Sequence, residues 1–362
     1  MDKKDGVTYA RFGASRIGAS HIRKGLPLQD AFLTDEYRGF FIAAVADGHG
    51  NRRHFRSDRG AQIACQVAVQ SIREEINFSP ASPPNEERME ALKRTICFSW
   101  REKMLEDYAH SPWTEEEMAE AKANYSENQF DELRRGATAL RAYGSTLCAV
   151  FANERGWAAL QVGDSGFTLV TPGGEYLWPM PESQINQGNR TASLCMEDPL
   201  VDFRHCGGSG RPAGLLVYTD GIEKSFPPQS EGMISFLHWA WNNERSGAPA
   251  REERLCETLD TLTRRNRIGD DVTIAGLADL GAVDAKPRLT PIQRAGEMDR
   301  LRAQMEEIDG TVAYITEQLL QCRKQGSCAE DIRKLEEIIR RKTEESKRLQ
   351  ARAEQMKRSK IE

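Results

Sequence analysis

Four short motifs, each placing aspartate next to glycine, are spread over the first three quarters of this 362-residue chain. They are Asp47-Gly48-His49-Gly50, Gly163-Asp164-Ser165, Thr219-Asp220-Gly221 and Gly269-Asp270-Asp271-Val272-Thr273. Each adjoins a short apolar run, which favours a buried strand, although periodicity alone leaves a helix open. A lone Asp-Gly pair usually marks a turn. Four at strand ends instead predict carboxylates that converge on hard metal ions, as in a metal-dependent hydrolase.

The order and content of these motifs resemble the PPM/PP2C family of metal-dependent protein serine/threonine phosphatases. The similarity runs from about Ala10 to Leu277. Beyond the four motifs, it includes Gly18-Ala19-Ser20-His21, Gln29-Asp30-Ala31-Phe32, Ala44-Val45-Ala46, Tyr143-Gly144-Ser145-Thr146-Leu147, Gln161-Val162 and Tyr218. The resemblance implies an α+β fold, an α-β-β-α sandwich of two antiparallel sheets flanked by helices, with the metals in a cleft at one end of the sheets.

The resemblance also implies a metal centre. Asp47 would bridge two Mn²⁺ or Mg²⁺ ions, and Asp164 would help to hold a third, weaker ion. The full set implied to hold metals, directly or through water, is Asp47, Gly48 through its carbonyl, Asp220, Asp270, Asp164 and Asp30. Oxygen ligands suit these ions, and the scarcity of paired Cys or His argues against zinc. Such a centre activates a water molecule for attack on a phosphate ester.

Two further roles follow from the resemblance. His49 matches a proposed proton donor to the departing Ser or Thr oxygen, with a structural histidine as the equally weighted alternative. Many relatives bind phosphate with an arginine placed a few residues before the Asp30 motif, and the corresponding stretch here is Ile22-Arg23-Lys24-Gly25-Leu26-Pro27-Leu28. Arg23 is the first candidate for this phosphate-binding residue and Arg16 the second, followed by Lys24. Ordinary solvated cations are the alternative for at least two of the three.

Bulk properties favour a soluble, cytoplasmic protein. The longest apolar runs are too short to span a membrane, and the start Met1-Asp2-Lys3-Lys4-Asp5 lacks a signal-peptide core. The eight cysteines form no CxxC pair, which favours reduced thiols. With a net charge of −5 and dispersed basic residues, nothing supports nucleic-acid binding.

Two segments lie between the catalytic motifs. The first, Glu86 to Ala139, is helical in composition, and we expect its apolar stripe to belong to the core. That stripe is Met89, Leu92, Ile96, Trp100 and Met104. Thr114 is expected to cap a further helix there. The second, Phe226 to Thr263, corresponds to a variable flap in relatives, and its Trp239-Ala240-Trp241 is expected either to contact a protein substrate or to pack internally.

The sequence changes character after Leu280. We predict a phosphatase domain over 1–280, a linker over 281–291 and an antiparallel helical (coiled-coil) hairpin over 292–362, with the break at Gln325-Gly326-Ser327. The first apolar stripe is Leu301, Met305, Ile308, Val312, Ile315, Leu319 and Cys322; the second is Ile332, Leu335, Ile339, Leu349, Ala353 and Met356. Because a two-helix hairpin buries little by itself, it should pack on the catalytic domain, another copy or a partner. A solvated extension is the alternative.

Together these features predict a bacterial-type phosphatase that acts on phosphoserine and phosphothreonine in proteins, opposite a cognate Ser/Thr kinase. Two alternatives stay open. One is a catalytically weak scaffold that binds phosphoproteins or partners, and the other is a phosphatase of a small phosphorylated metabolite. We expect the hairpin to serve self-association or a protein partner.

Overall fold

The computed structural model describes residues 8–80, 83–136, 138–186, 191–266, 268–283, 286–324 and 329–358. The chain forms two compact units. The first comprises Met1–Pro228 and Gly232–Arg288, and the second comprises Gln229–Glu231 and Leu289–Glu362. The domain boundaries expected from the sequence stay a prediction, and the expected break at Gln325-Gly326-Ser327 lies outside the described residues.

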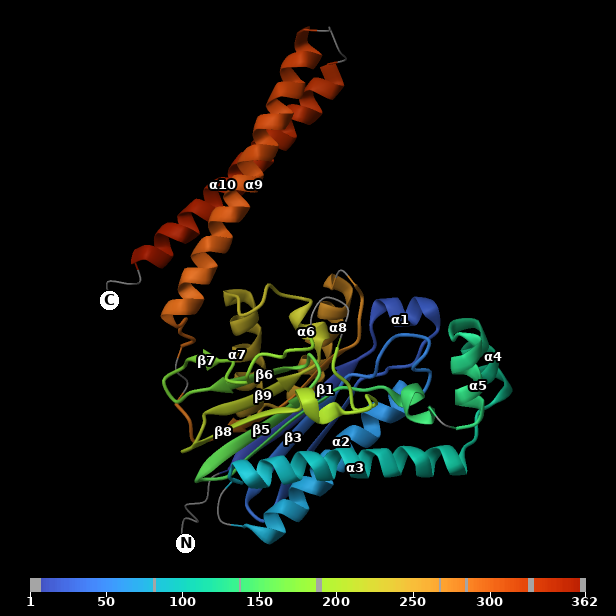
Figure 1. The fold of residues 1–362 in the computed structure, drawn as a ribbon. Coiled ribbons are helices and arrows are strands. Elements are labelled where there is room, and N and C mark those ends of the chain that lie inside the picture. The colour runs from blue at the N-terminus through green and yellow to red at the C-terminus, as the bar shows by residue number, and fades with distance from the viewer. Residues whose placement is uncertain are drawn as a thin grey trace. The chain divides into compact units, whose positions relative to one another are not determined.

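The first unit contains two five-stranded antiparallel sheets (Figure 1). The first sheet has the order β1 (Tyr9–Arg16), β10 (Val272–Asp279), β9 (Gly214–Tyr218), β6 (Gly166–Val170) and β7 (Tyr176–Leu177). The second has the order β2 (Ala31–Tyr37), β3 (Phe40–Ala46), β4 (Leu147–Ala152), β5 (Gly156–Val162) and β8 (Arg204–Ser209).

Strand β3 shows how the two layers are held together. Its side chains alternate between the two faces, as the two-residue period of a strand requires. Phe41 and Val45 belong to the apolar core shared with Val217 of β9, which joins the two sheets. Phe40 and Ile42 belong to a second core, formed with the helices that cover the other face. All seven residues of β3 are buried, which explains the continuous apolar run in the sequence.

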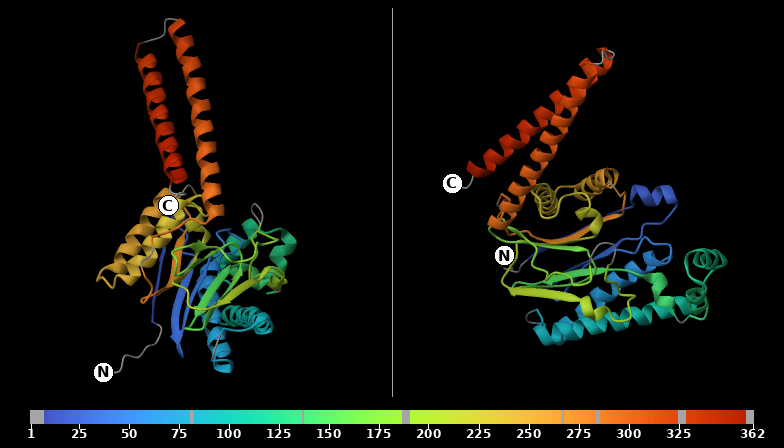
Figure 2. Two further views of the ribbon diagram at one scale, coloured as in Figure 1. Left: turned by 90° about the vertical axis from the view of Figure 1, so that its left-hand side faces the viewer. Right: turned by 45° about the horizontal axis from the view of Figure 1, so that its top comes forward.

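Helices cover both outer faces of the two sheets, as the views of Figures 1 and 2 show. The helices of the first unit are α1 (Ala19–Lys24), α2 (Ser57–Phe78), α3 (Glu86–His110), α4 (Glu115–Asn124), α5 (Glu127–Arg134), α6 (Asp220–Glu223), α7 (Glu231–Arg245) and α8 (Arg251–Arg265). Helix α2 packs on β2, β3 and β4, and α3 packs on α2. Helix α8 packs on β1 and β10. The predicted sandwich is therefore confirmed.

Helices α3 and α4 also confirm their predictions. The whole apolar stripe of α3 is buried, and its Trp100 indole N–H donates to the Gly60 carbonyl at 3.1 Å. Thr114 caps α4 in a reciprocal capping box with Glu117. In the expected flap, Trp241 of α7 is buried and donates to the Ala213 carbonyl at 2.8 Å. Internal packing is thus the role of Trp241.

The second unit is an antiparallel pair of helices, α9 (Pro291–Lys324) and α10 (Ala329–Arg358). Two contacts fix the antiparallel register: Ser346 donates to Asp309 at 3.1 Å, and Arg323 pairs with Glu336. The first predicted apolar stripe is buried or half-buried along its length. Among the described helices, none combines the length and apolar composition that a membrane crossing needs.

Candidate metal centre and catalytic cavity

Four of the predicted carboxylates converge on one cavity of about 350 Å³. Asp47 follows β3, and Asp164 follows β5 two residues after its end. Asp220 follows β9 and begins α6, and Asp270 lies just before β10. The strand-end placement predicted from the sequence is confirmed for all four. The other lining residues are His49, Gly50, Asn51, His54, Thr146, Thr191 and Lys224.

The backbone around Asp47 is held by Thr146, which lies 99 residues later in the sequence. The N–H of Asp47 donates to Thr146 Oγ1 at 2.9 Å, and the N–H of Thr146 donates to the Asp47 carbonyl at 2.9 Å. Gly48 lies in a crowded position. A Cβ there would come within 2.5 Å of the Gln29 carbonyl oxygen and 2.6 Å of that of Ser57. Only glycine fits this close approach of three chain segments.

Asp30 lies behind the cavity and does not line it. Its carboxylate is buried and accepts a hydrogen bond from Thr219 Oγ1 at 2.7 Å. Thr219 in turn precedes Asp220, so Asp30 supports the segment that carries a lining carboxylate. Burial, followed by the negative charge of Asp271, raises the pKa of Asp30 well above its usual range. This arrangement fits the indirect role expected for Asp30.

The carboxylates of the cavity lie close enough together to raise one another's pKa values. Burial raises the pKa of Asp47 well above its usual range, and the carboxylates of Asp30, Asp220 and Asp270 raise it further. Burial also raises the pKa of Asp220 to about 6, although the ammonium of Lys224 opposes this. The Oδ1 atom of Asp220 is buried without a hydrogen-bond partner among the described residues. Buried acceptors without partners are costly, so this carboxylate set fits bound cations.

Lys224 is the one lysine or arginine among the described residues that line the cavity. Its Nζ atom lies 2.5 Å from Asp220 Oδ2 and 2.6 Å from Asp270 Oδ2. Lys224 follows Asp220 by four residues, the spacing that places two side chains on the same side of a helical turn. The sequence reasoning missed Lys224, because α6 is a single turn of four residues.

Two histidines line the cavity side by side. The rings of His49 and His54 meet edge to face, with centroids 4.8 Å apart. His54 Nδ1 lies 2.5 Å from the Arg141 carbonyl oxygen. Because a carbonyl can only accept, Nδ1 carries the proton, and Nε2 of a neutral His54 is left as an acceptor. A Cβ at Gly144 would lie 2.4 Å from His54 Nδ1, so glycine leaves room for this pair.

Burial keeps both imidazoles neutral. It lowers the pKa of His49 to about 3, with a further contribution from His54, and it lowers the pKa of His54 in the same direction. A neutral His49 serves as a proton donor only when a nearby anion, such as a phosphate dianion, raises its pKa. Sequence reasoning singled out His49 and missed His54, which is brought in by the turn at Arg141 to Gly144.

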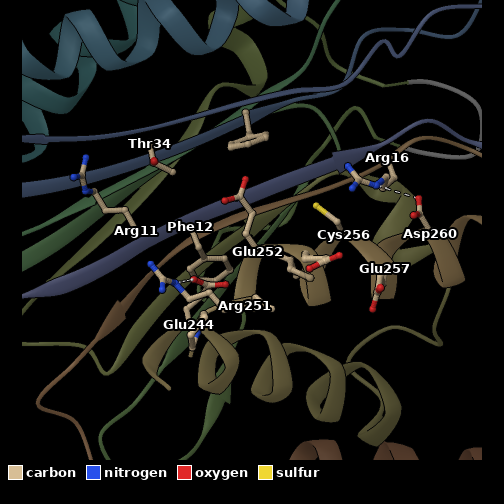
Figure 3. A pocket seen from close by; sticks show the side chains of 16 residues that line it. Arg11, Phe12, Arg16, Thr34, Glu244, Arg251, Glu252, Cys256, Glu257 and Asp260 are labelled. Carbon is tan, nitrogen blue, oxygen red and sulfur yellow. Dashed lines mark ion pairs between the residues drawn. The ribbon is translucent and has the colours of Figure 1, made fainter. Parts of the chain in front are cut away.

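The structure does not bring Arg16 or Arg23 to this cavity. Arg16, at the end of β1, lies 3.1 Å from Asp260 of α8. It lines a separate cavity of about 900 Å³ between β1, β2 and α8, where Figure 3 shows the Arg16–Asp260 ion pair. Arg23 and Lys24 are exposed on α1. The expected phosphate-binding role of Arg16 and Arg23 therefore has no support in their placement.

The orientation of α1 explains the position of Arg23. His21 is the inward residue of this helix, and its Nδ1 lies 2.9 Å from Asp271 Oδ1. Asp271 also accepts hydrogen bonds from the backbone N–H groups of Gly18 and Gln29, both at 2.7 Å. Residues two apart on a helix do not share a face. Because His21 points inward, Arg23 points to solvent and away from the carboxylates that line the small cavity.

The family model described as protein phosphatase 2C matches residues 17–260. No curated protein sequence matches the chain. Among solved structures, the catalytic domain of the serine/threonine phosphatase PstP, in complex with two manganese ions, is 13% identical, with 75% of this chain and 98% of that chain covered and a TM-score of 0.44.

Two further solved structures have similar scores. PppA, described as a key regulatory component of the T6SS in Pseudomonas aeruginosa, is 17% identical, covers 76% of this chain and 100% of its own, and has a TM-score of 0.45. The S. agalactiae serine/threonine phosphatase is 15% identical, with 75% and 99% covered and a TM-score of 0.44. The family match spans about two thirds of the chain and includes three of the four aspartates of the cavity. The chain therefore belongs to the protein phosphatase 2C family of protein serine/threonine phosphatases.

Proposed function

We propose that this protein hydrolyses phosphoserine and phosphothreonine in other proteins by using water activated at a centre of two divalent ions, Mn²⁺ or Mg²⁺. The observation that carries the proposal is the convergence of four strand-end carboxylates on one small cavity. Among them, Asp220 keeps an oxygen buried and without a hydrogen-bond partner in the described chain. An oxygen-rich, cation-poor cavity of this kind is suited to hard divalent ions.

The ligands follow from the lining of the cavity. Asp47, Asp220 and Asp270, with the carbonyl of Gly48, would hold two ions, and Asp164 would help to hold a third. When bound, the ions lower the pKa of a water molecule and neutralise the phosphoryl oxygens. Asp30 keeps its indirect role, because its hydrogen bond with Thr219 positions the segment that leads into Asp220.

Lys224 takes the place of Arg16 and Arg23 as the proposed phosphate-binding cation. Its ammonium neutralises Asp220 and Asp270 in this structure. When those carboxylates hold cations, the ammonium is free to pair with a phosphoryl oxygen as a point charge. His49 lines the same cavity and serves either as proton donor to the leaving oxygen or as a structural histidine. The edge contact with His54 holds the His49 ring in place.

The decisive experiment measures turnover of a phosphoserine peptide with Mn²⁺, with Mg²⁺ and with excess chelator. We expect turnover with either ion and none with chelator. Asp270→Asn should abolish most turnover, whereas Asp131→Asn, at a half-exposed position on α5, should not. Full turnover by the chelated protein would refute the metal-based mechanism.

The same assay separates the alternatives. A scaffold would bind the phosphopeptide without turnover under any metal condition. A metabolite phosphatase would turn over a small phosphomonoester such as a sugar phosphate with a kcat/KM well above that for any phosphopeptide. We expect the phosphopeptide to be preferred. A cytoplasmic location and a cognate Ser/Thr kinase stay predictions from the sequence.

For the second unit we propose self-association. All the proposed ligands lie before Leu280, and the α9–α10 pair has its own small core formed by Leu301, Ala353 and Met356. A chain ending after Arg288 should therefore keep its hydrolysis of a small aryl phosphate but lose association, as measured by light scattering. If the shortened chain lost aryl phosphatase activity and both forms were monomeric, the proposed division into domains would be wrong.

A further inference from the structure

Helix α10 has two distinct faces within its own unit. One face meets α9: Ile332, Leu335, Ile339 and Leu349 are half-buried, and Ser346 donates to Asp309 of α9. A different stripe of six exposed side chains lines a hollow of about 490 Å³. These residues, here called the charged stripe, are Glu337, Arg340, Arg341, Glu344, Glu345 and Arg348. Their spacing of three and four residues places them along one side of the helix.

The charges of this stripe form a self-complementary pattern. Read along the chain, their signs are minus, plus, plus, minus, minus and plus. A two-fold axis between Lys342 and Thr343 would bring a second, antiparallel copy into a defined register. The resulting pairs are Glu337 with the second copy's Arg348, Arg340 with its Glu345, and Arg341 with its Glu344. Every pair joins opposite charges, and two-fold symmetry forms each pair twice. A parallel in-register pairing would instead place like charges together.

Most of these charges are not used within the chain. Among the described residues, Glu345 pairs with Lys342 at 2.8 Å, and the other five members of the charged stripe form no ion pair. The complementarity also has a natural end. The next residue along the stripe is Arg333, whose symmetry counterpart, Arg352, is already paired with Glu297 at 3.0 Å. The pattern thus covers 337–348, about 17 Å of helix.

We propose that the charged stripe of α10 docks on the same stripe of a second copy of this chain, antiparallel, about a two-fold axis between Lys342 and Thr343. This deepens the self-association proposed for the second unit and does not depend on the chemistry of the cavity. Exposed ion pairs are individually weak, so they select the register and the partner. The arginine stems supply apolar contact along the stripe. The pairing is therefore sensitive to salt.

The test uses two full-length variants with opposite charge reversals. The acidic variant carries Arg340→Glu and Arg341→Glu, and the basic variant carries Glu344→Arg and Glu345→Arg. In each, two of the three kinds of pair become like-charged, so self-association should weaken at least about tenfold in sedimentation equilibrium. When the two variants are mixed, every pair across the axis joins opposite charges. The equimolar mixture should therefore form a heterodimer at the wild-type affinity or tighter.

A matched control separates this interface from general charge effects. Glu306→Lys with Glu307→Lys changes the net charge as much as the basic variant does, at exposed positions on α9, and should associate like wild type. All variants should keep wild-type helicity and wild-type aryl phosphatase activity. A monomeric wild type at micromolar concentration would overturn both the self-association and this interface. Dimeric variants, or a monomeric mixture beside a dimeric wild type, would overturn this interface alone.

Discussion

Two cavities of the first unit are lined by charged side chains, but they differ in how far those charges are paired or exposed to solvent. In the larger one, beside α8, Arg16 pairs with Asp260 at 3.1 Å and Arg251 with Glu244 at 3.2 Å. The remaining carboxylates of its lining, Glu252, Glu253 and Glu257, are exposed to solvent. In the smaller one, four carboxylates face the single ammonium of Lys224. Paired charges at a surface satisfy one another and contribute little. Buried charge without a partner persists where a ligand is to complete it, so the burial of unpaired charge identifies a candidate site better than cavity size does.

The strongest test of this contrast is Asp47→Asn in the small cavity. Losing this proposed metal ligand should lower kcat on an aryl phosphate by about a thousandfold or more, because the ions that Asp47 would hold would supply several kcal/mol of charge stabilisation. Without metal the variant should be at least as stable as wild type, since burial and repulsion already oppose the charge of Asp47. Steady-state kinetics and thermal unfolding would check both. Wild-type turnover by this variant would remove Asp47 from the mechanism.

Lys224→Met should have the next largest effect. We expect kcat/KM to fall by about ten- to a hundredfold as an ion pair with the substrate phosphate is lost. We also expect tighter Mn²⁺ binding by calorimetry, because the ammonium no longer competes for Asp220 and Asp270. Lys103→Met, at an exposed lysine of α3, is the control. Unchanged kinetics together with unchanged Mn²⁺ affinity would show that Lys224 is only a surface neighbour of the cavity.

The metal-free protein should respond to pH in an unusual direction. The folded-state pKa of Asp220, about 6, lies above its ordinary value of 3.8. A carboxyl group with a raised pKa destabilises the fold once it ionises, so its penalty is absent below about pH 4 and complete above pH 6. We expect the melting temperature of the metal-free protein to fall between about pH 4 and pH 6 and to level off above that range. The fall should be smaller in Asp220→Asn, and an equal fall in both proteins would contradict this assignment.

The smallest effects are expected for arginines outside the small cavity. Arg16→Ala removes a partly exposed ion pair with Asp260, which contributes about 0–1 kcal/mol to stability. Its kcat/KM should stay within about twofold of wild type, as should that of Arg23→Ala on α1. A loss of tenfold or more in either variant would restore that arginine as the phosphate-binding residue and displace Lys224.

The sequence predicted best what local pattern determines. The all-buried run of β3 ends at Asp47, and β9 ends just before Asp220, so the position of each carboxylate follows from its strand. Side-chain direction was harder to predict. Arg23 precedes the Asp30 motif closely in sequence, but its direction depends on which side of α1 His21 anchors. Lys224 depends on the single helical turn of α6, which is too short to have a periodic signature.

Long-range neighbours were harder still. The ring of His54 is held beside that of His49 by a hydrogen bond to the Arg141 carbonyl. Arg141 lies 87 residues after His54 in the sequence. The pairing of Arg16 with Asp260 likewise depends on α8 packing against β1, which no local pattern encodes. In the second unit, the apolar stripes were predictable from the heptad spacing because they repeat along one helix. The pairing proposed for the charged stripe of α10 becomes apparent only when a second, symmetry-related copy of the helix is considered.

The four lining carboxylates divide evenly between the two sheets. Asp47 and Asp164 follow strands of one sheet, and Asp220 and Asp270 adjoin strands of the other. The distance between these two pairs of carboxylates therefore depends on the spacing of the two sheets. That spacing is set by the thickness of the apolar layer around Val217. A larger or smaller side chain in that layer would change the distance between the two halves of the proposed metal centre without touching a ligand. The packing of this core would therefore also set the geometry of the proposed metal centre.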